Sequence, residues 1–199
     1  MYQYFTKVLL VFFLTLTINA QDEISFDWKS PNKWTGGEFK VPTWFAKDMK
    51  VSGYEILHFH DGYYDSSSVG HWSYVFALVV NELDEPSEAF LIDETKRYFL
   101  GLGRTLGDKK NPKLSANVIK VKPTSKAYKS FYTGKVQDFK LTAFDSWESA
   151  KPIELNTRIY TWMCKNKNHR AIVYAISPQN KSHPIWDQLT AEVHAFSCE

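Results

Sequence analysis

The sequence predicts an α+β fold, with a longer helix near residues 86–102 and a short C-terminal helix packed on a largely antiparallel sheet. Strand patterns come in runs separated by helical patterns, without regular β-α-β alternation, and this order is typical of α+β domains. Apolar residues make up 44% of the 199 residues and aromatic residues 16%, enough for one core rich in strands. We therefore expect a single domain over residues 21–199, with both helices on one face of the sheet.

The first two strands are predicted at Tyr54–His60 and Trp72–Val80. The first alternates between two faces, as a half-buried strand does. The second is almost continuously apolar, which indicates burial on both faces. The loop over residues 61–70 joins them as a hairpin. Residues 21–49 carry tryptophans among prolines and glycines, so we expect an extended segment that lies against the core.

A helix is predicted from about residue 86, where apolar side chains begin to recur at helical spacing. Asp84 is a candidate N-cap, and Pro86 suits the first turn. Lys96 and Arg97 lie nearer the negative end of the helix dipole. Gly101 is expected to end the helix.

Five further strands and a short helix complete the predicted order. Among these five strands, turn-like residues favour one hairpin between the second and the third and another between the fourth and the fifth. The short helix begins at Pro184, and residues 195–199 finish as a strand or a frayed end. The five strand candidates are Asn117–Val121, Tyr128–Tyr132, Val136–Phe144, Ile153–Cys164 and Arg170–Ser177.

The N-terminus has the pattern of a secretory signal peptide over residues 1–20. Lys7 precedes the apolar run Val8–Leu16, which is too short to span a bilayer as a helix. The small Ala20 followed by the polar Gln21 predicts cleavage between these two residues. We therefore expect an exported protein, periplasmic or secreted, whose mature part has no membrane span.

Cys164 and Cys198 are the only two cysteines. In an exported chain such a pair favours a disulfide, with two separate buried thiols as the alternative. Closing the loop between these two cysteines would stabilise the fold by about 3 to 4 kcal/mol in the chain-entropy description.

Four short motifs resemble a family of uncharacterised exported bacterial proteins. They are Pro42 with Trp44, the segment 53–55, the Trp-Ser-Tyr segment 72–74, and residues 98–102 at the end of the predicted helix. The motifs cover less than a third of the chain and consist mainly of packing residues. The resemblance implies a bacterial, periplasmic setting and carries no activity with it.

His58, His60 and His71 form a candidate metal site. On a strand His58 and His60 share a face, and a hairpin with its loop centred near Asp65 would bring His71 beside them. Three nitrogen ligands with an open fourth position suit a catalytic zinc. The alternative is that these are ordinary solvated or hydrogen-bonded histidines at a sheet edge.

A basic stretch runs from residue 109 to residue 135 without an intervening acid. It suits an acidic glycan or another acidic envelope component, and the alternative is a lysine-protected sheet edge. Nucleic acid is not expected as a partner of an exported protein. The lysines are Lys109, Lys110, Lys113, Lys120, Lys122, Lys126, Lys129 and Lys135.

Aromatic side chains in the first part of the chain form a third candidate, a stacking surface for a sugar or peptide. Taken together, the patterns favour a binding domain for an unknown ligand, without a cofactor. The alternative is a zinc-dependent hydrolase built on the three histidines. The aromatic candidates are Trp28, Trp34, Trp44, Tyr63, Tyr64 and Trp72.

Overall fold

The computed structural model of the protein describes residues 25–81, 83–106, 118–129, 134–145 and 151–199. Its centre is an eight-stranded sheet in which all paired strands are antiparallel. In spatial order, the strands are β2 (Thr35–Val41), β3 (Gly53–Phe59), β4 (Tyr74–Asn81), β9 (His169–Ser177), β8 (Lys151–Met163), β7 (Lys135–Asp145) and β5 (Lys120–Pro123), with β6 (Tyr128–Lys129) also paired to β7.

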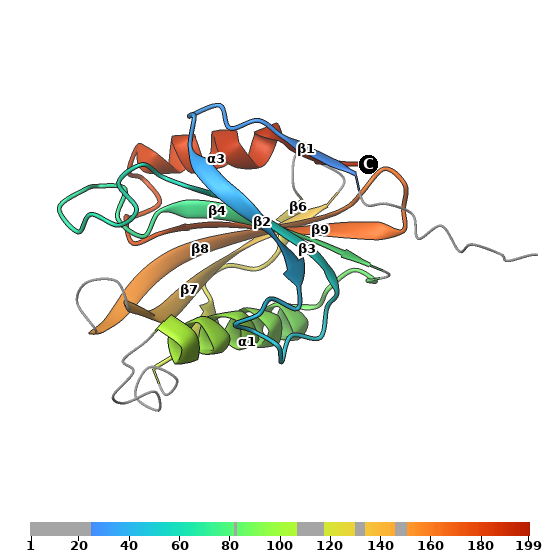
Figure 1. Cartoon of the computed structure of the whole chain (residues 1–199), viewed down its shortest axis with the longest axis horizontal. Coiled ribbons are helices and arrows are strands. Elements are labelled where there is room, and N and C mark those ends of the chain that lie inside the picture. Colours follow the sequence, from blue (N-terminus) through green and yellow to red (C-terminus); the bar gives the residue numbers. More distant parts are fainter. Residues whose placement is uncertain (1–24, 82, 107–117, 130–133, 146–150) are drawn as a thin grey trace, which may run out of the picture.

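The two described helices cover opposite faces of this sheet (Figure 1). Helix α1 (Glu88–Leu106) packs on one face and α3 (Ile185–Ala195) on the other. The α+β class is confirmed, but the expectation that both helices share one face was wrong. Strand β4 explains why: Phe76 and Leu78 pack in the core under α1, whereas Val75 and Ala77 pack in the core under α3. Because the central strands are apolar on both faces, both faces need a cover.

The predicted strands are confirmed within the described residues, with small shifts at their ends, whereas residue 117 and residues 130–132 of two predicted strands lie outside those residues. The expectation that Gly101 ends the long helix was wrong, because α1 continues to Leu106. The hairpins β3–β4, β6–β7 and β8–β9 pair as predicted. The N-terminal segment was expected to have no regular structure, and this was wrong. Its residues form β2 at the sheet edge and β1 (Phe26–Trp28), which pairs with β10 (Phe196–Cys198) beside α3 (Figure 1). The pair Gly36-Gly37 reads as a turn in sequence, yet lies within β2.

The disulfide between Cys164 and Cys198 is confirmed, with a Cα–Cα distance of 5.1 Å. It ties the residue after β8 to the last residue of β10. Both cysteines are buried in the core under α3. The disulfide therefore holds the C-terminal strand, and β1 paired with it, against the main sheet.

The predicted signal peptide, with its cleavage between Ala20 and Gln21, lies outside the described residues, as do Lys109, Lys110 and Lys113. In the part of the chain that is described, no helix is long and apolar enough to cross a bilayer.

Candidate functional site

A cleft of about 520 Å³ opens on the face of the sheet that carries α1. Strands β2 and β3 form its floor, and α1, the segment after β2 and the loop after β3 form its sides. Eight of the described residues that line it are aromatic. These are Phe39, Trp44, Phe45, Phe59, Tyr63, Tyr64, Tyr74 and Tyr98, and the other lining residues are Thr35, Gly36, Gly37, Leu57, His60, Asp61 and Leu102.

Two series of touching rings form the aromatic walls. On one side Trp44 meets Phe45 edge to face at 5.6 Å, and Phe45 meets Tyr98 in the same way at 5.1 Å. On the other side Tyr64 and Tyr63 are perpendicular, with ring centroids 4.8 Å apart. Edge-to-face contacts hold rings at fixed angles to one another. These packed rings come from three separate parts of the chain: the segment after β2, helix α1 and the loop after β3.

Three rings of the cleft remain largely in solvent. The exposed fractions are 60% for Trp44, 58% for Tyr64 and 40% for Phe39. Large aromatic side chains that gather around a concavity and are not covered mark a ligand site more often than they mark unfinished packing.

Gly37 leaves room in the floor of the cleft. It lies on β2 opposite Leu57, and a Cβ built on it would meet only the Phe39 ring, at 3.5 Å, which is an ordinary contact distance. Its neighbour Gly36 differs, because a Cβ there would lie 1.5 Å from the backbone oxygen of Leu57. A larger side chain at Gly37 would therefore extend into open space, whereas one at Gly36 would disrupt the sheet.

The charge of the cleft is negative or neutral. Asp61 is the acid in its lining, and the described lining residues include no lysine or arginine. Burial lowers the pKa of the His60 imidazole, an effect that outweighs the opposing influence of Asp61. His60 is therefore mostly uncharged at neutral pH.

A buried carboxyl group is bonded to one of the aromatic residues that line the cleft. Glu55, on β3, is fully buried, and its Oε1 accepts a hydrogen bond of 2.5 Å from the hydroxyl of Tyr98. Its Oε2 has no hydrogen-bond partner among the residues that the structure describes. Burial raises the pKa of Glu55 to about 7, although the bond from Tyr98 acts in the opposite direction. The chain thus keeps an incompletely satisfied acid in contact with a residue that lines the cleft.

The structure brings half of the aromatic candidates to one place. Trp44, Tyr63 and Tyr64 all line the cleft. The other three candidates pack elsewhere. Trp28 contacts His58 and Phe196, Trp34 contacts His60, and the fully buried Trp72 donates a hydrogen bond to Asp145.

Sequence reasoning missed five of the eight aromatic residues of the cleft, namely Phe39, Phe45, Phe59, Tyr74 and Tyr98. Tyr74 was taken as part of a buried strand and Tyr98 as part of the core face of the helix. Phe39 lies in a segment that was not predicted as a strand. The sequence held a signal for Phe39. Because Phe39 and Gly37 are two residues apart, they lie on the same face of the sheet once β2 is recognised as a strand.

The three candidate metal ligands have separate roles in the described structure. The Nδ1 of His58 lies 3.0 Å from the Glu192 carboxylate on α3. The Nδ1 of His60 accepts a bond of 2.8 Å from the backbone of Gly62, and the buried Nε2 of His71 has no hydrogen-bond partner within the described part of the chain. Among the described residues, no three His, Cys, Asp or Glu side chains group in a way that could hold a metal ion. The zinc site stays a prediction.

Glu192, which sequence reasoning did not single out, joins the N-terminal segment to α3. It is fully buried, and it accepts hydrogen bonds from the side chains of Ser30 and Asn32 as well as contacting His58. Burial alone would raise the pKa of Glu192, but these bonds outweigh it and hold the pKa below its usual range. Such a carboxylate is a structural anchor for the segment before β2.

Part of the basic stretch lies at a sheet edge. Lys120 and Lys122 are exposed on β5, the last strand in the sheet order, with the buried Val121 between them. Lys135 forms an ion pair of 2.9 Å with Glu85. The described lysines therefore agree with protection of a sheet edge, and the acidic-glycan partner stays a prediction.

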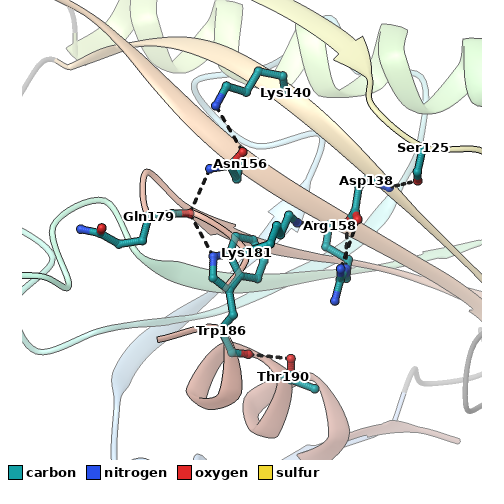
Figure 2. A network of polar contacts seen from close by, with 9 residues as sticks. All are labelled: Ser125, Asp138, Lys140, Asn156, Arg158, Gln179, Lys181, Trp186 and Thr190. Atoms are coloured by element: carbon teal, nitrogen blue, oxygen red, sulfur yellow. Dashed lines mark hydrogen bonds and ion pairs between the residues drawn. The ribbon is translucent and has the colours of Figure 1, made fainter. Parts of the chain in front are cut away.

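A second polar cluster lies on the face of the sheet that carries α3 (Figure 2). Arg158 binds Asp138 through two bonds of 2.7 and 3.1 Å, and Lys181 binds the same carboxylate at 3.0 Å. Burial acts to raise the pKa of Asp138, but these two cations hold it below its usual range. Burial also lowers the pKa of Lys181 to about 8. Lys181 lies 3.7 Å from the centre of the Trp186 ring.

The contacts around this cluster explain it as a structural clamp. The Nε1 of Trp186 and the side chain of Asn156 both donate to the backbone oxygen of Gln179 (Figure 2). The cluster thereby fastens the segment between β9 and α3 to strands β7 and β8.

In comparisons with known proteins, no family model matches the sequence and no curated protein matches it significantly. The resemblance to exported bacterial proteins therefore stays a prediction.

Proposed function

We propose that the protein is a binding domain that holds a small ligand with apolar or ring-shaped parts in the aromatic cleft. The observation that carries this proposal is the concentration of eight aromatic side chains around one open cleft of about 520 Å³. Ligand pockets in proteins have volumes of roughly 300 to 1,000 Å³ and are lined mainly by apolar and aromatic groups with a few polar ones.

Polar and apolar residues of the cleft come from different segments of the chain. His60, Asp61 and Tyr63 follow β3 in a short stretch of chain, whereas Trp44 and Phe45 come from the segment after β2. A ligand with one polar end and one apolar end fits this distribution. An acidic ligand fits it less well, because the charge of the described lining is not positive.

The test uses the neutral fluorescent probe N-phenyl-1-naphthylamine, whose emission rises in apolar sites. We expect wild-type protein to bind it and the variant Gly37→Ile to bind it at least about tenfold more weakly, because the new side chain occupies the floor of the cleft. Gly37 has an unstrained backbone and β-branched residues suit strands, so the variant should fold.

The matched control is Glu38→Ile on the same strand. Glu38 is exposed and lies opposite Ile56, which packs in the core under α3, so its side chain is on the other face of the sheet. This variant should bind the probe as wild type does. Equal binding of the probe by wild type and Gly37→Ile would contradict the proposal.

The proposed setting is outside the cytoplasm, in the periplasm or in the secreted fraction. The signal-like N-terminus supports it, and so does the disulfide, since disulfides persist in oxidising compartments. A zinc-dependent hydrolase using His58, His60 and His71 remains the rival hypothesis, and no geometric observation favours it.

A further inference from the structure

We propose that the preferred ligand of the aromatic cleft is an organic cation, with a quaternary or alkylated ammonium group held among the aromatic rings. This inference rests on the proposed function, since it assumes that the cleft is a ligand site. It goes further by naming the chemical class of the ligand.

The ring arrangement is the first observation. The face of an aromatic ring is electronegative, and several rings set at angles around one space attract a cation from more than one side. Trp44 is perpendicular to Phe45, with an interplanar angle of 88°, and Tyr63 is perpendicular to Tyr64 at the same angle. Indole is the best ring for this contact, and Trp44 is the most exposed large apolar side chain of the described residues.

The charge of the lining is the second observation, and it is independent of the first. The cleft presents Asp61, a neutral His60 and, among its described residues, no lysine or arginine. The chain as a whole has 24 basic and 22 acidic residues, so the lack of cations here is not a general property of the sequence. An ammonium ligand would meet no repulsive charge in this lining and one attractive charge.

The third observation is the buried acid that is bonded to the cleft wall. The side chain of Glu55 is fully buried and bonded to Tyr98, a residue of that wall, and its Oε2 has no hydrogen-bond partner among the described residues. When Glu55 is ionised, its negative charge acts through low-dielectric surroundings and further favours a cation in the cleft. A permanently charged ammonium also needs no proton acceptor, so it can be bound by ring faces and a distant carboxylate alone.

The test compares choline with 3,3-dimethylbutan-1-ol, its neutral isostere, by calorimetry at low ionic strength. We expect choline to bind about fivefold or more tightly than the alcohol, because the two ligands share shape and differ in charge. Trp44→Leu and Asp61→Asn should each reduce choline binding by a factor of about three to five while leaving that of the alcohol nearly unchanged.

The matched control is Asp93→Asn, which removes the same charge from an exposed position on α1 that does not line the cleft. Its choline binding should equal that of wild type. The cation inference would be overturned if choline bound no more tightly than the alcohol. If Gly37→Ile still weakened binding of the naphthylamine probe in that case, the proposed binding function would stand. Failure of choline, the alcohol and the naphthylamine probe to bind at all would overturn both.

Discussion

Replacing both cysteines by alanine is expected to reduce the free energy of unfolding by about 3 to 4 kcal/mol. Cys164 and Cys198 are 34 residues apart, and their covalent link removes much of the freedom of that loop in the unfolded chain. Alanine is the suitable replacement, because both side chains are buried and a serine hydroxyl would need a new partner. Urea unfolding of the variant beside oxidised wild type measures the difference.

Wild-type protein with its disulfide chemically reduced is the control for this experiment. It should lose a similar amount of stability, since it lacks the same link but keeps the cysteine side chains. A loss below about 1 kcal/mol in both samples would show that the loop is restrained in the unfolded state by other means.

Replacing Glu55 by glutamine is expected to make the protein more stable above pH 7 and to change its stability little near pH 4.5. In the folded state the pKa of Glu55 is raised from 4.5 to about 7, so the folded protein keeps a proton that the unfolded chain has already released. The contribution of Glu55 is therefore complete below pH 4.5 and is lost as the pH rises to about 7. This rise in the pKa of Glu55 corresponds to a change of about 3 kcal/mol in the free energy of unfolding.

The measurement is the difference in unfolding free energy between Glu55→Gln and wild type, taken at several values of pH between 4.5 and 8.5. Taking the difference removes the contributions of other shifted acids such as Asp138 and Glu192, which both chains share. Glu38→Gln, at an exposed position on β2, should show no such pH dependence. A difference that does not change with pH would mean that Glu55 ionises normally in the folded protein.

Several features of the fold could be predicted because they depend on local pattern. Alternation of apolar and polar residues identified β3, the continuous apolar run identified β4, and helical spacing identified α1. The predicted ends of α1 were wrong, because Ser87 rather than Asp84 accepts the capping bond and the helix continues past Gly101 to Leu106. The disulfide was also predictable, because two cysteines in an exported chain allow only one intramolecular pairing. Strand β2 was not predicted, since Gly36 and Gly37 have low strand propensity and only pairing with β3 makes them part of the sheet.

The candidate site was only half visible in the sequence. Trp44, Tyr63 and Tyr64 were singled out as aromatic residues, but nothing in their spacing separates them from Trp28 or Trp34, which pack against other elements. The strand spacing of the histidines predicts a shared site. In the structure, however, His58 contacts Glu192, a residue more than a hundred positions away in the chain. Contacts of this kind depend on which face of the sheet each helix covers.

The sequence by itself determined the α+β class, the main hairpins, the long helix and the disulfide. The strands and the helix follow from residue propensity and periodicity over short segments, and the disulfide follows from the number of cysteines, wherever they lie in the chain. Tertiary structure alone decided the rest. It placed α1 and α3 on opposite faces, added β2 as an edge strand, brought the aromatic residues of the cleft together and bonded one of them, Tyr98, to the buried Glu55. The physical reason is that the burial of a side chain and the charge of a cleft depend on elements that are far apart in the chain. A local sequence pattern does not contain that information.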